Sequence, residues 1–262
     1  FDSSVINGAV DSIESDFALN DVITGFVVAI ALLGCAFGAI LAGTLSDRFG
    51  RLKVMLIGAV MFLTSAFGSG LAFGVWDLTF WRLIGGIGIG IASVVAPAYI
   101  AEVAPRQIRG TLGSLQQLAI TLGIFAALLS DALLANIAGG ANEPMWFGLD
   151  AWRWMLLVEA IPALVYGILA LTMPESPRYL IARGRMDEAK EIFSRLMPPE
   201  DLEITVNELE KKIQADRKNA GVSLRGPVFG LQGIVWIGII LSVFQQFVGI
   251  NVIFYYSTTL WR

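Results

Sequence analysis

The chain has 262 residues with a net charge of −4, and only 15% of its residues are charged, against about 25% in a typical soluble domain. It therefore lacks the basic surface that a nucleic-acid partner requires. It contains no histidine and a single cysteine, which excludes disulfide frameworks, Cys/His metal sites and histidine-based catalysis within these residues. The composition predicts an all-α polytopic membrane protein that is not an enzyme and needs neither a metal nor a cofactor.

Only ten residues, 1–10, precede an acidic stretch that begins at Asp11. These residues are too few to cross a bilayer, because a spanning helix needs about 20 residues. We expect them to be the outer half of a first helix that begins before this sequence, which places Asp2 inside the membrane. A carboxylate at such depth costs about 2.5–3.5 kcal/mol and is a functional candidate. The alternative is that Asp2 belongs to a frayed end of the chain.

Two long runs without Asp, Glu, Lys or Arg follow, residues 22–46 and 54–76. At about 1.5 Å per residue, each run is long enough to span the membrane as a helix. The hinge between them, residues 43–53, is short and basic. The positive-inside rule places this hinge in the cytoplasm.

A fourth helix is predicted over residues 78–101, and it holds one charge, Arg82. An unpaired guanidinium is untenable in hydrocarbon, so Arg82 either pairs with an acid such as Asp2 or extends to the outer surface. Gly86 and Gly90 line one face of this helix at the spacing that allows close helix packing.

The fifth helix is predicted over 111 to about 130 and carries Gln116 and Gln117. These amides need hydrogen-bond partners, either on neighbouring helices or in a polar cavity. An outer loop over 131–153 leads to a sixth helix over 154–172, which contains one acid, Glu159.

The segment after the sixth helix is rich in charge, and it holds ten of the eighteen basic residues, between 174 and 225. Its amphipathic stretches predict water-facing cytoplasmic helices. Fifteen of the eighteen Lys and Arg residues lie in segments predicted to be inside, and only Arg153 lies in an outer loop. This asymmetry fixes the predicted orientation.

The last run, residues 226–261, is uncharged and has Gln245, Gln246 and Asn251 in its middle. A regular helix would scatter these three amides around its axis. They could meet one cavity if the helix unwinds near Gly249, as discontinuous transporter helices do. Simple bonding between helices is the alternative.

Five motifs in this order resemble those of the sugar porter family of the major facilitator superfamily. They are residues 43–53, Arg82 with Gly86, residues 99–110, residues 174–180 and residues 245–251. The resemblance covers essentially the whole chain and implies the first seven of twelve helices. It divides the chain into an N-terminal transmembrane bundle (1–174), a cytoplasmic helical linker (175–225) and a seventh transmembrane helix that starts the C-terminal bundle (226–262).

The resemblance also implies roles for individual residues. Five residues stand at positions that hydrogen-bond sugar hydroxyls in the family, namely Gln116, Gln117, Gln245, Gln246 and Asn251. Residues at positions of the inner, cytoplasmic gate network of charge pairs are Asp47, Arg48, Arg51, Glu102, Arg109, Glu175 and Arg178. Ile124 stands where some relatives carry another polar contact, which leaves the identity of the sugar open.

Residues 1–5 match the first-helix motif in which proton-coupled members carry Asp. Asp2, Arg82 and Glu159 are therefore the implied proton-coupling residues, although Glu159 could instead make a buried structural hydrogen bond. The implied function is symport of a monosaccharide, hexose or pentose, with protons by alternating access. A passive sugar facilitator and a transporter-like sugar sensor are the alternatives. We expect a monomer in the lipid bilayer of a bacterial inner membrane.

Overall fold

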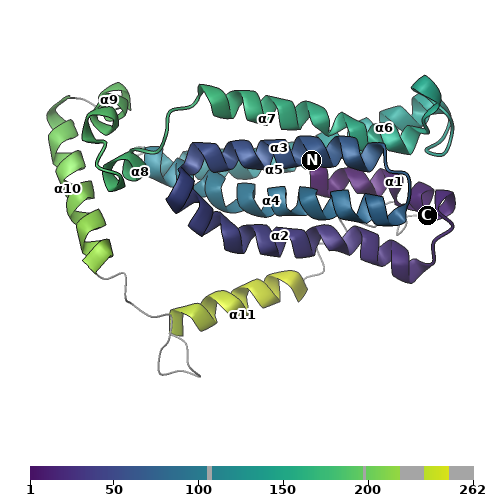
Figure 1. Cartoon of the computed structure of the whole chain (residues 1–262), viewed down its shortest axis with the longest axis horizontal. Coiled ribbons are helices and arrows are strands. Elements are labelled where there is room, and N and C mark those ends of the chain that lie inside the picture. Colours follow the sequence, from purple (N-terminus) through teal and green to yellow (C-terminus); the bar gives the residue numbers. More distant parts are fainter. Residues whose placement is uncertain (105–107, 197–198, 219–232, 248–262) are drawn as a thin grey trace. The chain divides into compact units, whose positions relative to one another are not determined.

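The computed structural model describes residues 1–104, 108–196, 199–218 and 233–247, and every regular element in these ranges is a helix (Figure 1). The chain forms two compact units, Phe1–Leu196 and Met197–Arg262. The first unit contains α1 (Asp2–Asp16), α2 (Asp21–Phe49), α3 (Arg51–Gly70), α4 (Val75–Val103), α5 (Arg109–Ala138), the 3-10 turn η1 (Trp146–Gly148), α6 (Ala151–Val158), α7 (Ala160–Thr172), α8 (Pro177–Ala182) and α9 (Met186–Leu196). The predicted all-α class is confirmed.

The second unit contains α10 (Pro199–Lys218) and α11 (Gly233–Phe247). Gln245 and Gln246 lie in the last turn of α11. Asn251 and the expected break near Gly249 lie outside the described residues. The domain boundaries expected at 174/175 and 225/226 stay a prediction, and α8 and α9 belong to the first compact unit.

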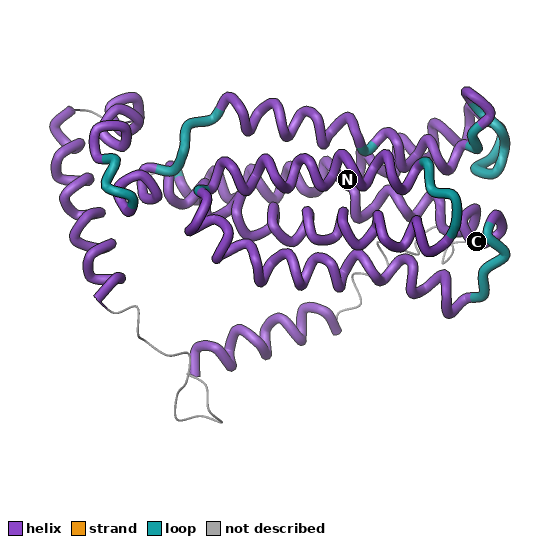
Figure 2. The backbone as a smooth tube through the Cα atoms, in the orientation of Figure 1, coloured by secondary structure: helices purple, strands orange, loops and turns teal. Residues whose placement is uncertain are grey.

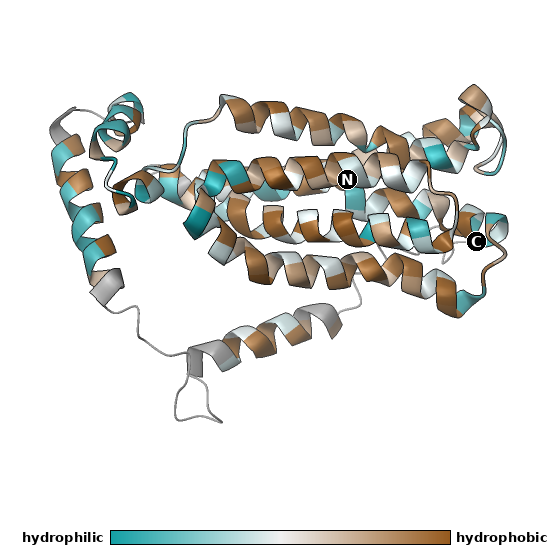
Figure 3. Cartoon of the chain, viewed as in Figure 1, coloured by the Kyte–Doolittle hydropathy of each residue, from teal (hydrophilic) through white to brown (hydrophobic). Residues whose placement is uncertain are grey.

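Among the described residues, five segments are long and apolar enough to cross a membrane, namely α2, α3, α4, most of α5, and α6 together with α7. In each of these segments, only 17–39% of the most apolar 18-residue stretch is buried inside the protein. Large apolar side chains such as Leu33 and Ile40 are therefore exposed, at 62% and 75%. A water-soluble surface rarely carries so much apolar area, so these faces suit lipid or other apolar helices. Figure 3 shows the same concentration of hydrophobic residues on α2–α7, in contrast to the hydrophilic α9 and α10.

Several helix limits differ from the expected ones; α3, for example, ends at Gly70 although the charge-free run continues to residue 76. The first helix continues to Asp16 through the acidic stretch, and the fifth continues to Ala138. Acidic residues do not by themselves end a helix, and α5 ends only at Gly139, which has a left-handed φ of 89°. Asp131, expected to begin the outer loop, is therefore inside α5.

The sixth span starts earlier than expected, at Ala151, and it is divided at Glu159 into α6 and α7. Pro162 follows this junction and has no backbone N–H to bond the carbonyl of Val158, which is a recognised cause of helix interruption. Figure 2 shows that α7 nevertheless follows α6 directly, with only a short break between the two helices.

The contact of α2 with α4 is built from glycine. A Cβ added at Gly38 would lie 2.2 Å from the carbonyl oxygen of Ile87, and one at Gly90 would lie 2.0 Å from that of Cys35. The two backbones therefore touch, which requires that neither position has a side chain. A Cβ at Gly86 would likewise lie 2.2 Å from the carbonyl oxygen of Ala31, so the packing role predicted for Gly86 and Gly90 is confirmed.

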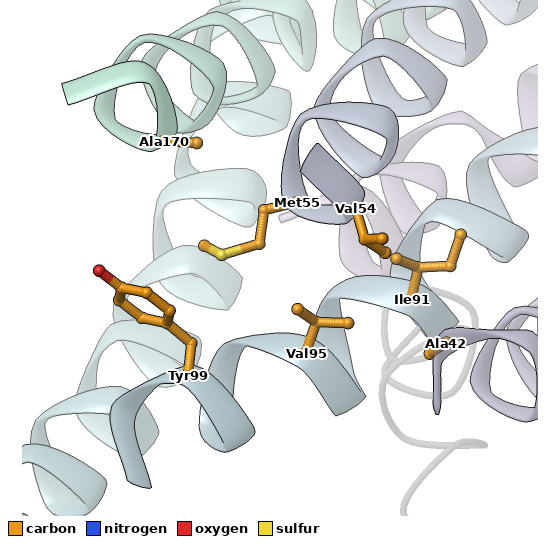
Figure 4. Close-up of a cluster of buried hydrophobic side chains, with 7 residues drawn as sticks. All are labelled: Ala42, Val54, Met55, Ile91, Val95, Tyr99 and Ala170. Atoms are coloured by element: carbon orange, nitrogen blue, oxygen red, sulfur yellow. The ribbon is translucent and has the colours of Figure 1, made fainter. Parts of the chain in front are cut away.

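A buried cluster of apolar side chains ties α2, α3, α4 and α7 together (Figure 4). It comprises Ala42, Val54, Met55, Ile91, Val95, Tyr99 and Ala170. Tyr99 also donates a hydrogen bond from its hydroxyl to the carbonyl oxygen of Pro174, at 2.8 Å. This bond anchors the chain just after α7 and positions the segment that follows it.

Gly38→Ala is expected to destabilise the protein. The new methyl group would meet the backbone of α4, and overpacking of this kind costs about 1–3 kcal/mol. Thermal unfolding in detergent, followed by tryptophan fluorescence, should show a lower midpoint than the wild type. Gly43→Ala is the matched control on the same helix, because a Cβ there meets no atom within 4 Å. Equal midpoints for the two variants would contradict the close-packing interpretation.

Candidate functional site

Arg82 and Asp2 form a buried ion pair. Arg82 Nη1 lies 3.2 Å from Asp2 Oδ1, and the two side chains are 1% and 10% exposed. Asp2 is in the first turn of α1 and Arg82 is in α4, so the pair joins two helices that are far apart in sequence. The prediction that Arg82 pairs with Asp2 is confirmed. The alternatives, a surface-directed Arg82 and a frayed Asp2, are wrong for this structure.

Glu159 completes the cluster from the junction of α6 and α7. It is 3% exposed and interacts electrostatically with both Asp2 and Arg82. The cluster thus contains two carboxyl groups and one guanidinium. It carries one excess negative charge unless one carboxyl binds a proton, and this is the property that a proton-coupling site requires.

The cluster retains unused hydrogen-bonding capacity. Within the described residues, Asp2 Oδ2, Arg82 Nε and Nη2, and Glu159 Oε1 are buried without a hydrogen-bond partner. Buried polar atoms are normally partnered, so these atoms mark a place where a proton, water or a polar ligand can be accommodated. Gly85 allows Ser65 and Asp2 to pack closely on α4, since a Cβ there would lie 2.4 Å from Ser65 Oγ and 3.2 Å from Asp2 Oδ2.

A second set of polar contacts lies at the turn between α2 and α3. Gly50 joins the two helices with a φ of 96°, and Glu175 fills the space that a side chain at Gly50 would need. Glu175 Oε1 accepts hydrogen bonds from the backbone N–H groups of Arg51 (3.0 Å) and Leu52 (3.2 Å). A carboxylate at a helix N-terminus is stabilised by those free N–H groups and by the helix dipole. Glu175 therefore caps α3 from a position after α7.

Arg51 connects this turn to α4. Its guanidinium pairs with Asp47 and with Glu102, each at 3.0 Å, and donates to the carbonyl oxygen of Ser46. Glu102 in turn accepts a hydrogen bond from the hydroxyl of Ser176. Four of the predicted gate residues, Asp47, Arg51, Glu102 and Glu175, are thus brought together.

The sequence interpretation missed two residues of α8 and its flank that fasten this helix to the end of α2. Tyr179 donates from its hydroxyl to the carbonyl oxygen of Arg48 at 3.3 Å, and Arg183 donates to the same oxygen at 2.6 Å. The last carbonyl groups of a helix have no partner within the helix, and cationic side chains suit them. Ser176 was also missed, although its place before Pro177 is a typical helix N-cap signal.

The other three predicted gate residues are Arg48, Arg178 and Arg109. The Arg48 guanidinium lies over the ring of Phe49, 5.3 Å from its centroid. Arg178 lies in α8. The side chain of Arg109, at the start of α5, lies outside the described residues. The gate role of all seven residues stays a prediction.

The predicted sugar contacts fall on α5 and α11. Gln116 is half-buried and Gln117 is exposed on α5, while the side chains of Gln245 and Gln246 and all of Asn251 lie outside the described residues. Ile124 is half-buried, two turns beyond Gln117. No group of three or more Cys, Asp or Glu side chains in the described ranges is arranged to hold a metal ion.

Glu175→Ala is expected to lower the free energy of unfolding by about 1 kcal/mol, the typical cost of losing a helix N-cap acceptor. Glu175→Gln keeps an acceptor oxygen and should lose less. The thermal midpoint in detergent measures both changes. Glu191→Ala is the control, because it removes only an exposed α9 ion pair with Arg195, which should have little effect. Wild-type stability of Glu175→Ala would show that the cap is not formed.

Comparison with known proteins identifies the family. Residues 2–262 match the family model of the sugar (and other) transporters. The whole chain is 52% identical to 56% of the glucose transport protein of a Synechocystis strain. It is also 37% identical to 57% of the D-xylose-proton symporter of Escherichia coli, and 35% identical to 55% of the arabinose-proton symporter of Bacillus subtilis. The chain therefore spans about half the length of these relatives.

Solved structures give the same result. The proton:xylose symporter bound to 6-bromo-6-deoxy-D-glucose matches with a TM-score of 0.86 and 38% identity, covering 98% of this chain and 58% of that one. A partially occluded inward-open form of the xylose transporter of Escherichia coli matches with a TM-score of 0.82 and 36% identity over 98% of this chain and 62% of that one. The chain belongs to the sugar transporter family and has the fold of the major facilitator superfamily.

Proposed function

We propose that this chain forms part of a transporter that carries a monosaccharide, hexose or pentose, together with protons. The observation that carries this proposal is the buried Asp2–Arg82 pair with Glu159 beside it. The names of two relatives, the D-xylose-proton and arabinose-proton symporters, support proton coupling. The relative with 52% identity, named a glucose transport protein, supports a hexose as one substrate.

Proton binding can be linked to conformation through the buried pair. When Asp2 binds a proton it loses its attraction for Arg82, and Glu159 remains to balance the guanidinium. Helices α1 and α4 are then free to separate, because their strongest buried polar contact is gone. A proton that favours one arrangement of the helices is by linkage bound more tightly in that arrangement. Coupling to the sugar follows if the sugar also prefers one arrangement.

The network around Arg51 and Glu175 is suited to act as an inner gate. The exposed Asp47 and the partly exposed Arg51 form a pair that is individually weak in water. A set of weak pairs and helix caps can hold one conformation and still break within a transport cycle. We place this network on the cytoplasmic side, together with α8 to α10, because the basic residues concentrate there.

The sugar would bind near the midplane, between this bundle and a second one, with alternating access from the two sides. We assign it the amides of Gln116, Gln117, Gln245, Gln246 and Asn251. Amides suit a sugar because each offers a donor and an acceptor to neighbouring hydroxyls. We further propose that the transporter works as a monomer in the bacterial inner membrane.

Asp2→Asn should abolish accumulation of sugar against its gradient. Asparagine cannot bind the transported proton, while Glu159 still balances Arg82 and preserves the fold. Proteoliposomes that contain the full-length gene product should then reach equal sugar concentrations on both sides despite an inward proton gradient, and sugar exchange should persist. Asp16→Asn, at the outer end of the same helix, is the control and should accumulate sugar normally.

Three outcomes of that experiment separate the alternatives. Gradient-driven accumulation by Asp2→Asn would overturn the assignment of the proton to Asp2. Wild-type protein that only equilibrates sugar, whatever the gradient, would be a passive facilitator, and binding without any flux would indicate a sensor.

Gln117→Ala should raise the KM for sugar uptake about three- to tenfold, the equivalent of one lost hydrogen bond of about 1 kcal/mol. The maximal rate should change little. Initial rates of uptake over a range of sugar concentrations measure both quantities. Gln214→Ala, on the exposed side of α10, is the control. An unchanged KM for Gln117→Ala would remove this residue from the proposed sugar site.

A further inference from the structure

A third buried carboxyl group lies in the contact between α1 and α5, away from the Asp2 cluster. Asp131 is inside α5 and only 4% exposed. It packs directly on Gly8 of α1: a Cβ added at Gly8 would lie 2.7 Å from Asp131 Cβ and 2.8 Å from Asp131 Oδ2. Because Gly8 has no side chain, the carboxyl group of Asp131 has room to pack against α1.

Both oxygens of Asp131 lack a hydrogen-bond partner among the described residues. The backbone N–H of Gly8 faces the carboxyl group, but it does not reach hydrogen-bonding geometry. An ionised carboxylate buried in this way costs several kcal/mol, whereas a neutral acid costs far less.

No basic side chain is placed to neutralise Asp131 in the described part of the chain. Arg82 of α4 is paired with Asp2. Arg153 of α6 donates to the carbonyl oxygen of Ala72 and pairs with Asp16. The remaining charged groups on the helices that contact α5 are acids, namely Asp11 and Glu14 on α1, Asp77 and Glu102 on α4 and Glu159 after α6, and Glu102 pairs with Arg51. An acid cannot neutralise an ionised Asp131, so none of these groups supplies the missing positive charge.

We infer that Asp131 is a second proton-binding group of the bundle, and that it carries a proton while α1 packs against α5. Asp131 lies opposite Gly8 of α1. Gly8 is six residues beyond Asp2, and at 1.5 Å per residue it is about 9 Å closer to the outer end of α1. Protonation of Asp131 is independent of whether Asp2 carries the transported proton. The bundle therefore holds two sites for protons, one beside Arg82 and one without any cation.

Infrared spectroscopy tests this inference, because a carboxylic acid and a carboxylate absorb at different frequencies. The full-length gene product, prepared with carbon-13 aspartate and placed in lipid, separates aspartate from glutamate signals. At about pH 6, above the ordinary aspartate pKa of about 3.9, exposed aspartates absorb as carboxylates. The wild type should show the absorption of a protonated aspartate, and Asp131→Asn should lose one such group.

Asp11→Asn is the matched control on α1, and it should leave the carboxylic-acid absorption unchanged. Asparagine resembles the neutral acid in shape, so Asp131→Asn should also keep the thermal midpoint of the wild type. Absence of protonated aspartate in the wild type, or an undiminished protonated-aspartate absorption in Asp131→Asn, would overturn the inference. A large loss of stability in Asp131→Asn would do the same, because it would mean that the ionised form is the one the fold needs.

Discussion

A guanidinium group cannot remain unpaired in an apolar interior, and the presence of Arg82 there constrains the rest of the bundle. Removing one partner of a buried pair typically costs about 3–5 kcal/mol, so α1 must present Asp2 to α4. The junction of α6 and α7 adds Glu159 to the same place. Three segments distant in sequence are thereby held by one charge, and the excess acid creates a place for a proton.

This arrangement depends on close helix packing, which glycine makes possible. The backbones of α2 and α4 touch at Gly38 and at Gly90. This contact sets the position from which Arg82 reaches α1. At the other end of the same helices, the α2–α3 turn is fixed by Gly50 and by the cap from Glu175. The buried pair and the capped turn therefore share the packed helices α2, α3 and α4, which would connect the proposed proton site to the candidate gate.

Much of this structure could be predicted from the sequence. Charge-free runs gave the spans, because a bilayer tolerates few charges, and the lone Arg82 predicted its acidic partner. Asp131 was misjudged, because a single acid resembles a loop signal until the helix around it is seen to pack on Gly8. The caps from Tyr179 and Arg183 were not predictable, since they bond backbone carbonyl groups, which carry no sequence signal. Gln117 could be assigned a role only by resemblance, because a sugar contact depends on the opposite wall of the cavity.

The central claim is that sugar movement and proton movement are one process that begins at the Asp2–Arg82 pair. The most direct measurement is the internal pH of proteoliposomes that contain the full-length gene product, when sugar is added outside without any imposed proton gradient. We predict that sugar entry acidifies the interior, in proportion to the sugar taken up. Sugar entry without a change of internal pH would contradict the claim.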